Sequence, residues 1–431
     1  MEINEKSGRR SFLQKAGAAL VAGTMINDLA FAQKAQKNKT LKVGLIGCGG
    51  RGNGAAAQAL QADPDAILTA VGDIFLPQAE QSLKELKELF PDRVKVSPEN
   101  IFIGFDAYKK VLATDVDVVL LTTPPAFRPE HFHEAVNAGK HVFAEKPVAI
   151  DAPGVRKVLA ASKKAKEKNL AVVSGFCFRY DYGKRAFYNQ IRQGKIGDVL
   201  SVSSTRNGGG LWVKEKQPEW TDMEYKLKNW LYYTWLSGDF ICEMMVHSLD
   251  LMSWAMGDKP PLKATGTGGR QVRVGDAYGN VYDHFAIEFE YADGIKCYHF
   301  SRQQEGCSNA NTVSITGTSG KGFINNGSGV HEITGKNKWA YSGEKNNMYE
   351  TQHEELFASI RKGKPINEGE KLAYSSLLGV LARMVAYTGQ TITWEQAMNS
   401  TETLGPPMTD YHRDLKWNDV TIAKPGITKF S

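Results

Sequence analysis

The chain has 431 residues, of which 42% are hydrophobic and 23% are charged, a globular composition with room for two domains and a large core. Its formal net charge of +6 is small for this length and the charges are scattered, which argues against a nucleic-acid partner. The sequence holds no apolar run long enough to span a membrane and no histidine or cysteine spacing typical of a metal site, so we expect neither.

The first 33 residues have the pattern of an export signal. Arg9 and Arg10 begin a twin-arginine motif, a mildly apolar segment follows over residues 16–26, and Ala30-Phe31-Ala32 is a suitable cleavage site. A basic amphipathic N-terminus without a targeting role is the alternative. The motif predicts a periplasmic protein that crosses the membrane already folded, with any cofactor loaded in the cytoplasm.

A glycine-rich turn follows the first hydrophobic strand. Its G-x-G-x-x-G glycines are Gly47, Gly49 and Gly52, and a helix begins directly afterwards, as in dinucleotide-binding folds. Gly47 permits the tight turn, Gly49 lets the backbone approach a pyrophosphate, and Gly52 lets the helix pack on the strand. We expect Gly50 and Arg51 to complete a phosphate site at the helix N-terminus. An ordinary strand–helix turn is the alternative.

A second strand ends at Asp73, which lies 21 residues after Gly52. The acid that holds the adenosine ribose is expected about 20 residues after such a loop. A carboxylate accepts hydrogen bonds from the ribose and repels a 2′-phosphate, and the neighbouring Ile74 and Phe75 supply no cation. The sequence therefore favours NAD over NADP.

Strands and helices alternate through residues 41–174, which predicts a doubly wound parallel sheet. The expected strands are 41–46, 68–72, 117–122, 141–144 and 171–174, and the expected helices are 78–90, 130–138 and 151–168. Residues 175–431 form the second predicted domain, in which segments of period two precede a return to helix. Its clearest expected elements are strands 281–291, 296–301 and 312–316 and helices 350–362, 370–388 and 394–399. We expect an α/β protein with an N-terminal Rossmann domain and a C-terminal α+β domain carrying a large, mostly antiparallel sheet.

A helix is predicted over residues 239–257, with Asp239 as its N-cap. One face is a hydrophobic core stripe, and the opposite face carries Glu243, His247, Asp250 and Trp254 within an arc of about 60°. The polar stripe has no lysine or arginine and its neighbours are apolar, so the histidine is expected to be buried between two carboxylates. Such a histidine has a pKa that its surroundings can tune, and both a catalytic site and a structural network fit the pattern.

Four motifs, taken in chain order, resemble those of the glucose–fructose oxidoreductase/inositol dehydrogenase (Gfo/Idh/MocA) family. They are the glycine loop, Thr123-Pro124-Pro125, the run that ends in Glu145-Lys146-Pro147, and His247-Ser248-Leu249-Asp250. The resemblance implies a nicotinamide cofactor, sugar or polyol substrates, and a homodimer or homotetramer formed through the open face of the second sheet. Arg128 and Glu243 depart from the common pattern, where many members have His and Asp.

The resemblance also assigns roles to individual residues. His247 is expected to act as general base and Lys146 to stabilise the reacting oxygen, while Glu243 orients His247 and Asp250 binds a neighbouring hydroxyl. The expected cofactor contacts are Gly47, Gly49, Gly50, Arg51, Gly52, Asp73, Thr123, Pro124, Glu145 and Lys146. The expected substrate contacts are Arg128, Arg179, Tyr180, Trp230 and Trp235, the tryptophans because aromatic faces suit sugars, although core packing is an equal alternative.

These observations predict an exported NAD-dependent oxidoreductase that acts on a CH–OH group of a sugar or glycoside, for example by oxidation at C3 to a keto sugar. The cofactor is expected to be held tightly, because the periplasm offers no free pool. One alternative is a glycoside hydrolase that works by transient oxidation and elimination, although such relatives typically lack the intact Glu-Lys-Pro triplet. A non-catalytic sugar- or nucleotide-binding scaffold is the other.

Overall fold

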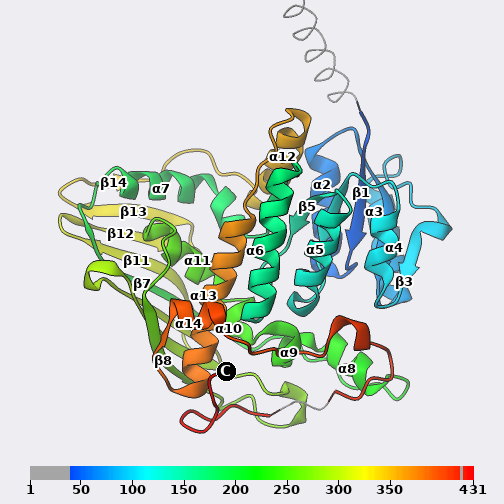
Figure 1. The fold of residues 1–431 in the computed structure, drawn as a ribbon. Helices are drawn as coiled ribbons and strands as arrows, with labels where there is room; N and C mark the ends of the chain where they lie inside the picture. The colour runs from blue at the N-terminus through cyan, green and yellow to red at the C-terminus, as the bar shows by residue number, and fades with distance from the viewer. Residues whose placement is uncertain (1–38, 418–420) are drawn as a thin grey trace, which may run out of the picture.

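The computed structural model describes residues 39–417 and 421–431, so the predicted export signal lies outside the described residues. Two sheets define two domains, with helices between them and around the first (Figure 1). The first sheet has six parallel strands in the order β3-β2-β1-β4-β5-β6. Its strands are β1 (Leu41–Ile46), β2 (Ala66–Asp73), β3 (Ile101–Ile103), β4 (Val118–Leu121), β5 (His141–Ala144) and β6 (Val172–Ser174).

Helices cover both faces of this sheet, which explains why its central strands β1 and β4 are apolar except for Lys42. All four residues of β4 are buried, as expected for a parallel strand between two helical layers. The helices are α2 (Gly50–Ala62), α3 (Leu76–Leu89), α4 (Ala107–Ala113), α5 (Arg128–Asn137) and α6 (Ala152–Glu167). The strand order reverses between β1 and β4, and ligands of such sheets bind at the carboxyl ends of the strands at that point.

The second sheet has nine strands in the order β14-β13-β12-β11-β7-β10-β9-β8-β15 and is antiparallel except where β7 pairs with β10. Burial alternates residue by residue along β9, so one face packs on helices and the other stays open. The strands are β7 (Val199–Gly208), β8 (Lys263–Gly269), β9 (His284–Glu290), β10 (Lys296–Gln303), β11 (Ala310–Gly317), β12 (Gly320–Asn325), β13 (Val330–Gly335), β14 (Trp339–Ala340) and β15 (Ile392–Thr393). Both predicted sheets are therefore confirmed.

Further helices join the two domains. The long helix α13 lies beside α6 in the centre of the molecule, and α8 and α9 extend below the first domain (Figure 1). These helices are α7 (Tyr182–Arg192), α8 (Asp222–Lys228), α9 (Thr234–Ser237), α10 (Phe240–Glu243), α11 (Val246–Ala255), α12 (Met348–Arg361), α13 (Gly369–Thr388) and α14 (Trp394–Asn399). One large hydrophobic core runs from the first sheet through α13 into the second, so the domains pack as one body.

The prediction of a single helix over residues 239–257 is wrong in one respect. Asp239 caps the helix as expected, its carboxylate accepting from the Phe240 N–H, but the helix is interrupted between α10 and α11. The N–H groups of Met244 and Met245 both donate to the Phe240 carbonyl, at 2.9 and 3.0 Å, which widens the turn by one residue. Such π-type irregularities are frequent at functional sites.

The five cysteines are free, four of them buried and Cys307 exposed. Within the described part of the chain, no helix is long and apolar enough to cross a membrane.

Candidate active site

The glycine loop has the geometry that its sequence predicts. Gly47 has a φ of +97°, and a Cβ there would lie 2.7 Å from the Thr123 backbone nitrogen. A Cβ at Gly52 would lie 1.9 Å from the Gly47 carbonyl oxygen, so α2 can start this close to β1 only without a side chain. Gly49 and Gly50, by contrast, face open space within 4 Å. The loop therefore offers bare backbone and the N-terminus of α2 to a ligand, as a pyrophosphate requires.

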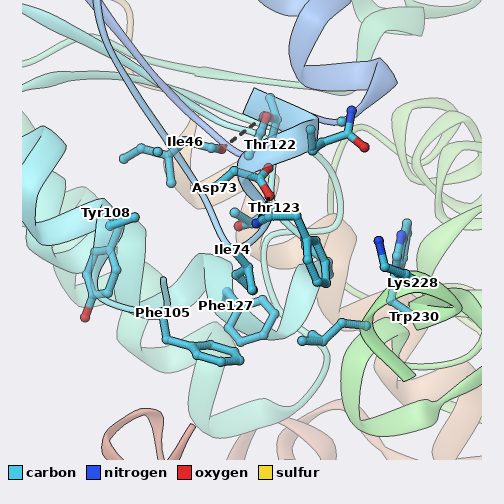
Figure 2. Close-up of a pocket in the computed structure, with 18 of the residues that line it drawn as sticks. Ile46, Asp73, Ile74, Phe105, Tyr108, Thr122, Thr123, Phe127, Lys228 and Trp230 are labelled. Carbon is cyan, nitrogen blue, oxygen red and sulfur yellow. Dashed lines mark hydrogen bonds between the residues drawn. The ribbon is translucent and has the colours of Figure 1, made fainter. Parts of the chain in front are cut away.

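A cavity of about 420 Å³ opens in front of this loop. Figure 2 shows Asp73, Thr123 and Phe127 on one side of it and Lys228 and Trp230 on the other. The first domain contributes Gly47, Gly49, Gly50, Asp73, Thr123 and Pro124, and the second contributes Trp212, Lys214, Leu227, Lys228 and Trp230. The sequence places Trp230 among the substrate contacts, whereas the structure places it in the wall of the nucleotide cavity.

Asp73 stands where the ribose of a dinucleotide would lie. Its carboxylate accepts the N–H groups of Cys48, at 2.6 Å, and Phe75, at 2.9 Å, which fixes its orientation at the end of β2. Burial raises the pKa of Asp73, against the opposing effect of these N–H groups. Carboxylate, open glycine backbone and cavity together fit a bound dinucleotide.

Lys228 also lies at this end of the cavity. Its ammonium nitrogen is 4.1 Å from the centroid of the Phe75 ring. Its positive charge partly opposes the effect of burial, which raises the pKa of Asp73. Sequence reasoning missed this cation because α8 is far from Asp73 along the chain, and no local motif marks it.

Glu145 directly follows β5 and is surrounded by cations. Arg51, in the first turn of α2, donates from Nε to Glu145 Oε1 at 2.5 Å. Burial would raise the pKa of Glu145, but the charges of Arg51, Lys146 and Arg128 outweigh it and keep that pKa below its ordinary value. The carboxylate therefore stays ionised beside the glycine loop and ties α2 to the loop after β5 that carries Lys146.

Lys146 bridges the two domains. Its Nζ donates to Glu243 Oε1 at 2.7 Å and to the Glu243 carbonyl at 2.5 Å. The interruption after α10 leaves this carbonyl available to the lysine. The structure thus brings Lys146 and Glu243 together, but Glu243 pairs with the lysine instead of orienting His247 as the sequence suggests.

His247 lies in the first turn of α11, shortly after Glu243 in the chain. Its ring packs against Phe176 and Phe178, at centroid distances of 5.9 and 5.1 Å, and Nδ1 is buried without a hydrogen-bond partner among the described residues. Burial lowers the pKa of His247 well below its ordinary value, and the charges of Lys146 and Arg206 lower it further. The imidazole is therefore neutral near pH 7, the form that a general base requires.

Arg206 is a member of the site that sequence reasoning missed. It lies on β7 and donates from Nη1 to the Met244 carbonyl at 3.3 Å, at the same helix interruption. The sequence pattern of this strand could have indicated Arg206. Val202, Ser204 and Arg206 lie on one face of β7, and the first two are buried. A charged residue at a core-facing position of an alternating strand indicates a function or a buried partner.

Asp250 and Arg179 form a buried ion pair. Arg179 donates from Nε and Nη2 to the Asp250 carboxylate at 2.8 to 3.0 Å, and the Ser375 hydroxyl donates to Oδ1 at 2.6 Å. The side chains are 1% and 8% exposed for Asp250 and Arg179 respectively, and Arg179 also pairs with Asp258. This geometry favours a structural role for both residues over the substrate contacts that the sequence suggests.

Three other expected substrate residues are also buried. Tyr180 donates its hydroxyl to Glu368 at 2.7 Å, and Trp235 packs in a hydrophobic cluster with Tyr411. Arg128 donates to the Pro147 carbonyl at 2.6 Å, so it supports the loop that carries Lys146. Within the described ranges, no group of three or more acidic, histidine or cysteine side chains is arranged to hold a metal.

A dinucleotide loop that is tied through Arg51 and Glu145 to the Lys146–Glu243 pair, with a neutral histidine nearby in the chain, is typical of NAD-binding oxidoreductases. Comparison with known proteins agrees: residues 41–175 match the oxidoreductase family with an NAD-binding Rossmann fold, and residues 185–322 match the GFO/IDH/MocA C-terminal domain. The chain belongs to the Gfo/Idh/MocA oxidoreductase family.

Individual relatives are distant. The inositol 2-dehydrogenase of Rhizobium meliloti is 25% identical over 80% of this chain and 97% of its own length. A 2,7-anhydro-N-acetylneuraminate hydratase of Mediterraneibacter gnavus is 28% identical over 42% of this chain and 43% of its own. The first curated relatives match over only about half of their own length. The aldose-aldose oxidoreductase structure from Caulobacter crescentus shares the fold, with a TM-score of 0.64, 17% identity and coverage of 82% of this chain and all of that one.

Proposed function

We propose that this protein oxidises a CH–OH group of a sugar or glycoside with NAD as hydride acceptor. The observation that carries the proposal is the Lys146–Glu243 contact, which joins the lysine of the nucleotide domain to the residue that ends α10, directly before the helix that carries His247. A relative that is an inositol 2-dehydrogenase supports a polyhydroxylated substrate.

The chain's own groups would manage the proton and the charge. His247 takes the hydroxyl proton as a neutral base, and the Lys146 ammonium hydrogen-bonds the same oxygen while its negative charge develops. The bound nicotinamide supplies the acceptor for the hydride that leaves the carbon. Glu243 positions Lys146, and Arg206 adds positive charge at the interrupted helix.

The cofactor we propose is NAD, because the Asp73 carboxylate faces the cavity where a 2′-phosphate would otherwise lie. We further propose export through the twin-arginine motif, with the cofactor retained after export, and assembly of a homo-oligomer. The exposed Leu200 and Phe300 on strands of the second sheet support an oligomer contact on its open face.

A second candidate is cleavage or hydration of a glycoside by transient oxidation and elimination, with the cofactor regenerated in each cycle. The relative named as a 2,7-anhydro-N-acetylneuraminate hydratase supports this second candidate. The intact Glu145-Lys146-Pro147 triplet favours net oxidation.

One experiment separates these functions. We expect the purified mature protein, mixed with a panel of sugars and glycosides and no added cofactor, to develop the near-ultraviolet band of reduced nicotinamide with one substrate. Free sugar or an unsaturated product without a lasting band would favour the elimination route instead. If the protein gives neither response and holds no nucleotide, both proposed functions are contradicted.

Substitution of Lys146 by Met is expected to lower kcat/KM by about 10²–10³-fold, because the developing oxyanion loses its donor. It should also move the acidic limb of the pH profile. The Lys146 charge helps to lower the pKa of His247 from its ordinary value of 6.5, so removing it raises that pKa and the limb moves to higher pH. Lys157→Gln, on the outer side of α6 with a side chain 45% exposed, is the control and should leave the profile unchanged. An unmoved limb in Lys146→Met would contradict the assignment of His247 as base.

A further inference from the structure

Residues 209–237 leave the second sheet after β7 and cross to the first domain. Their helices α8 and α9 lie below the carboxyl ends of the first sheet's strands (Figure 1). The excursion puts five side chains into the wall of the nucleotide cavity, namely Trp212, Lys214, Leu227, Lys228 and Trp230. The same segment contains Trp230 and Trp235, the two tryptophans that the sequence analysis associates with a sugar.

Hydrogen bonds join the start of this excursion, at Lys214, to its later part, at Asn229. Asn229 is fully buried, accepts the Lys214 N–H at 2.8 Å and donates to the Lys214 carbonyl at 3.0 Å. The start of α8 is closed by a capping box between Thr221 and Glu224. Lys214 and Lys228 therefore reach the cavity from a segment with a defined conformation.

The excursion is also fastened to the first domain. Phe127, which follows β4, packs in one hydrophobic cluster with Leu227 and Trp235 of the excursion, and Phe75 and Phe105 border that cluster. Opening the cavity from this side would expose that apolar contact to water, which opposes opening. This packing holds the excursion against the first domain at the side of the cavity where Asp73 lies.

Lys214 and Lys228 are not ion-paired. Neither has an acidic group within ion-pair distance among the described residues, although Lys216 two positions after Lys214 pairs with Asp222. Burial lowers the pKa of Lys228 and the charge of Lys214 lowers it further, while the more distant carboxylates of Glu224, Asp73 and Glu219 act in the opposite direction. Two neighbouring cations without an ion-pair partner, beside bare glycine backbone, suit an anionic ligand.

We propose that residues 209–237 clamp the adenosine half of the bound dinucleotide, with Lys214 and Lys228 contacting its phosphate and ribose oxygens. The inference rests on the proposed function for the identity of the ligand. It goes further in assigning nucleotide retention to a segment of the second domain. Such a clamp would slow the exchange of the bound nucleotide with free nucleotide in solution.

The test is nucleotide binding to the full-length mature protein, measured by titration calorimetry and by the nucleotide retained after gel filtration. Lys228→Gln and Lys214→Gln are each expected to weaken NAD and ADP-ribose by about tenfold or more, the loss of one charge-assisted hydrogen bond. Nicotinamide mononucleotide should bind equally to all variants. Lys216→Gln is the matched control, since Lys216 lies in the same segment but outside the cavity wall.

The outcomes are distinct. NAD bound equally by the wild type and both lysine variants would overturn the clamp while leaving the proposed function intact. Failure of the wild type to bind any dinucleotide would overturn both. Trp212→Ala, at a side chain that is 46% exposed and so tolerant of substitution, should raise the NAD dissociation rate without lowering the melting temperature.

Discussion

Replacing His247 by Ala is expected to lower turnover by about 10²–10⁴-fold while bound NAD remains, because the substitution removes the proton acceptor and leaves the nucleotide cavity untouched. The pKa of His247 is held well below its ordinary value by burial and by the charge of Lys146, so the wild-type residue is a neutral base throughout the neutral range. Stopped-flow absorbance with the substrate found in the panel measures the rate of nicotinamide reduction directly.

The control for this experiment is His133→Ala. His133 lies on α5 with a side chain that is 38% exposed, and its loss should change neither turnover nor binding. A His247→Ala protein that reduces its nicotinamide at the wild-type rate would remove His247 from the mechanism. A variant that loses bound NAD as well would assign it to cofactor binding.

Replacing Asp250 by Ala is expected to lower the free energy of unfolding by about 3–5 kcal/mol, since it leaves the Arg179 guanidinium buried with only part of its counter-charge. Arg179 is 8% exposed and would keep only Asp258, whose side chain is 30% exposed. Urea denaturation of the wild type and the variant measures the difference. A matched control is Asp106→Ala at the exposed Asp106–Lys110 pair, which should cost less than about 1 kcal/mol.

The same variant decides between two roles for Asp250. If the carboxylate is structural, stability falls and KM for the substrate stays near its wild-type value in the folded fraction. If it binds a substrate hydroxyl, KM rises and stability changes little. The four hydrogen bonds from Arg179 and Ser375 to this carboxylate are the basis for expecting the first result.

Much of the architecture follows from local sequence. The predicted strands of the first sheet, the helices at residues 350–362 and 370–388, and the alternating strands of the second sheet all correspond to observed elements. The glycine loop could be predicted because Gly47 needs a positive φ for the turn and Gly52 approaches the Gly47 carbonyl closely, and both restrictions arise between residues near each other in the chain. Hydrophobic periodicity and the residue preferences of turns depend on residues close together in the chain, so they can be predicted from the sequence alone.

The partners of the site residues were less predictable. Helical periodicity placed Glu243 and His247 on one face, but the interruption at Met244 and Met245 turned Glu243 toward Lys146. A helical wheel assumes a regular turn of 3.6 residues and so cannot show this interruption. Lys146 and Arg206, which come from distant parts of the chain, donate to the carbonyls there.

The sequence by itself determined the two-sheet architecture, the dinucleotide loop, Asp73 and the order of the motifs around Lys146 and His247. Only the tertiary structure decided that Arg179 neutralises Asp250, that Arg206 joins the site, and that Lys228 faces the Asp73 end of the cavity. The physical reason is that conformational demands act between near neighbours in the chain. Charge pairing and cavity walls depend on distances in space, between residues that are far apart in the sequence.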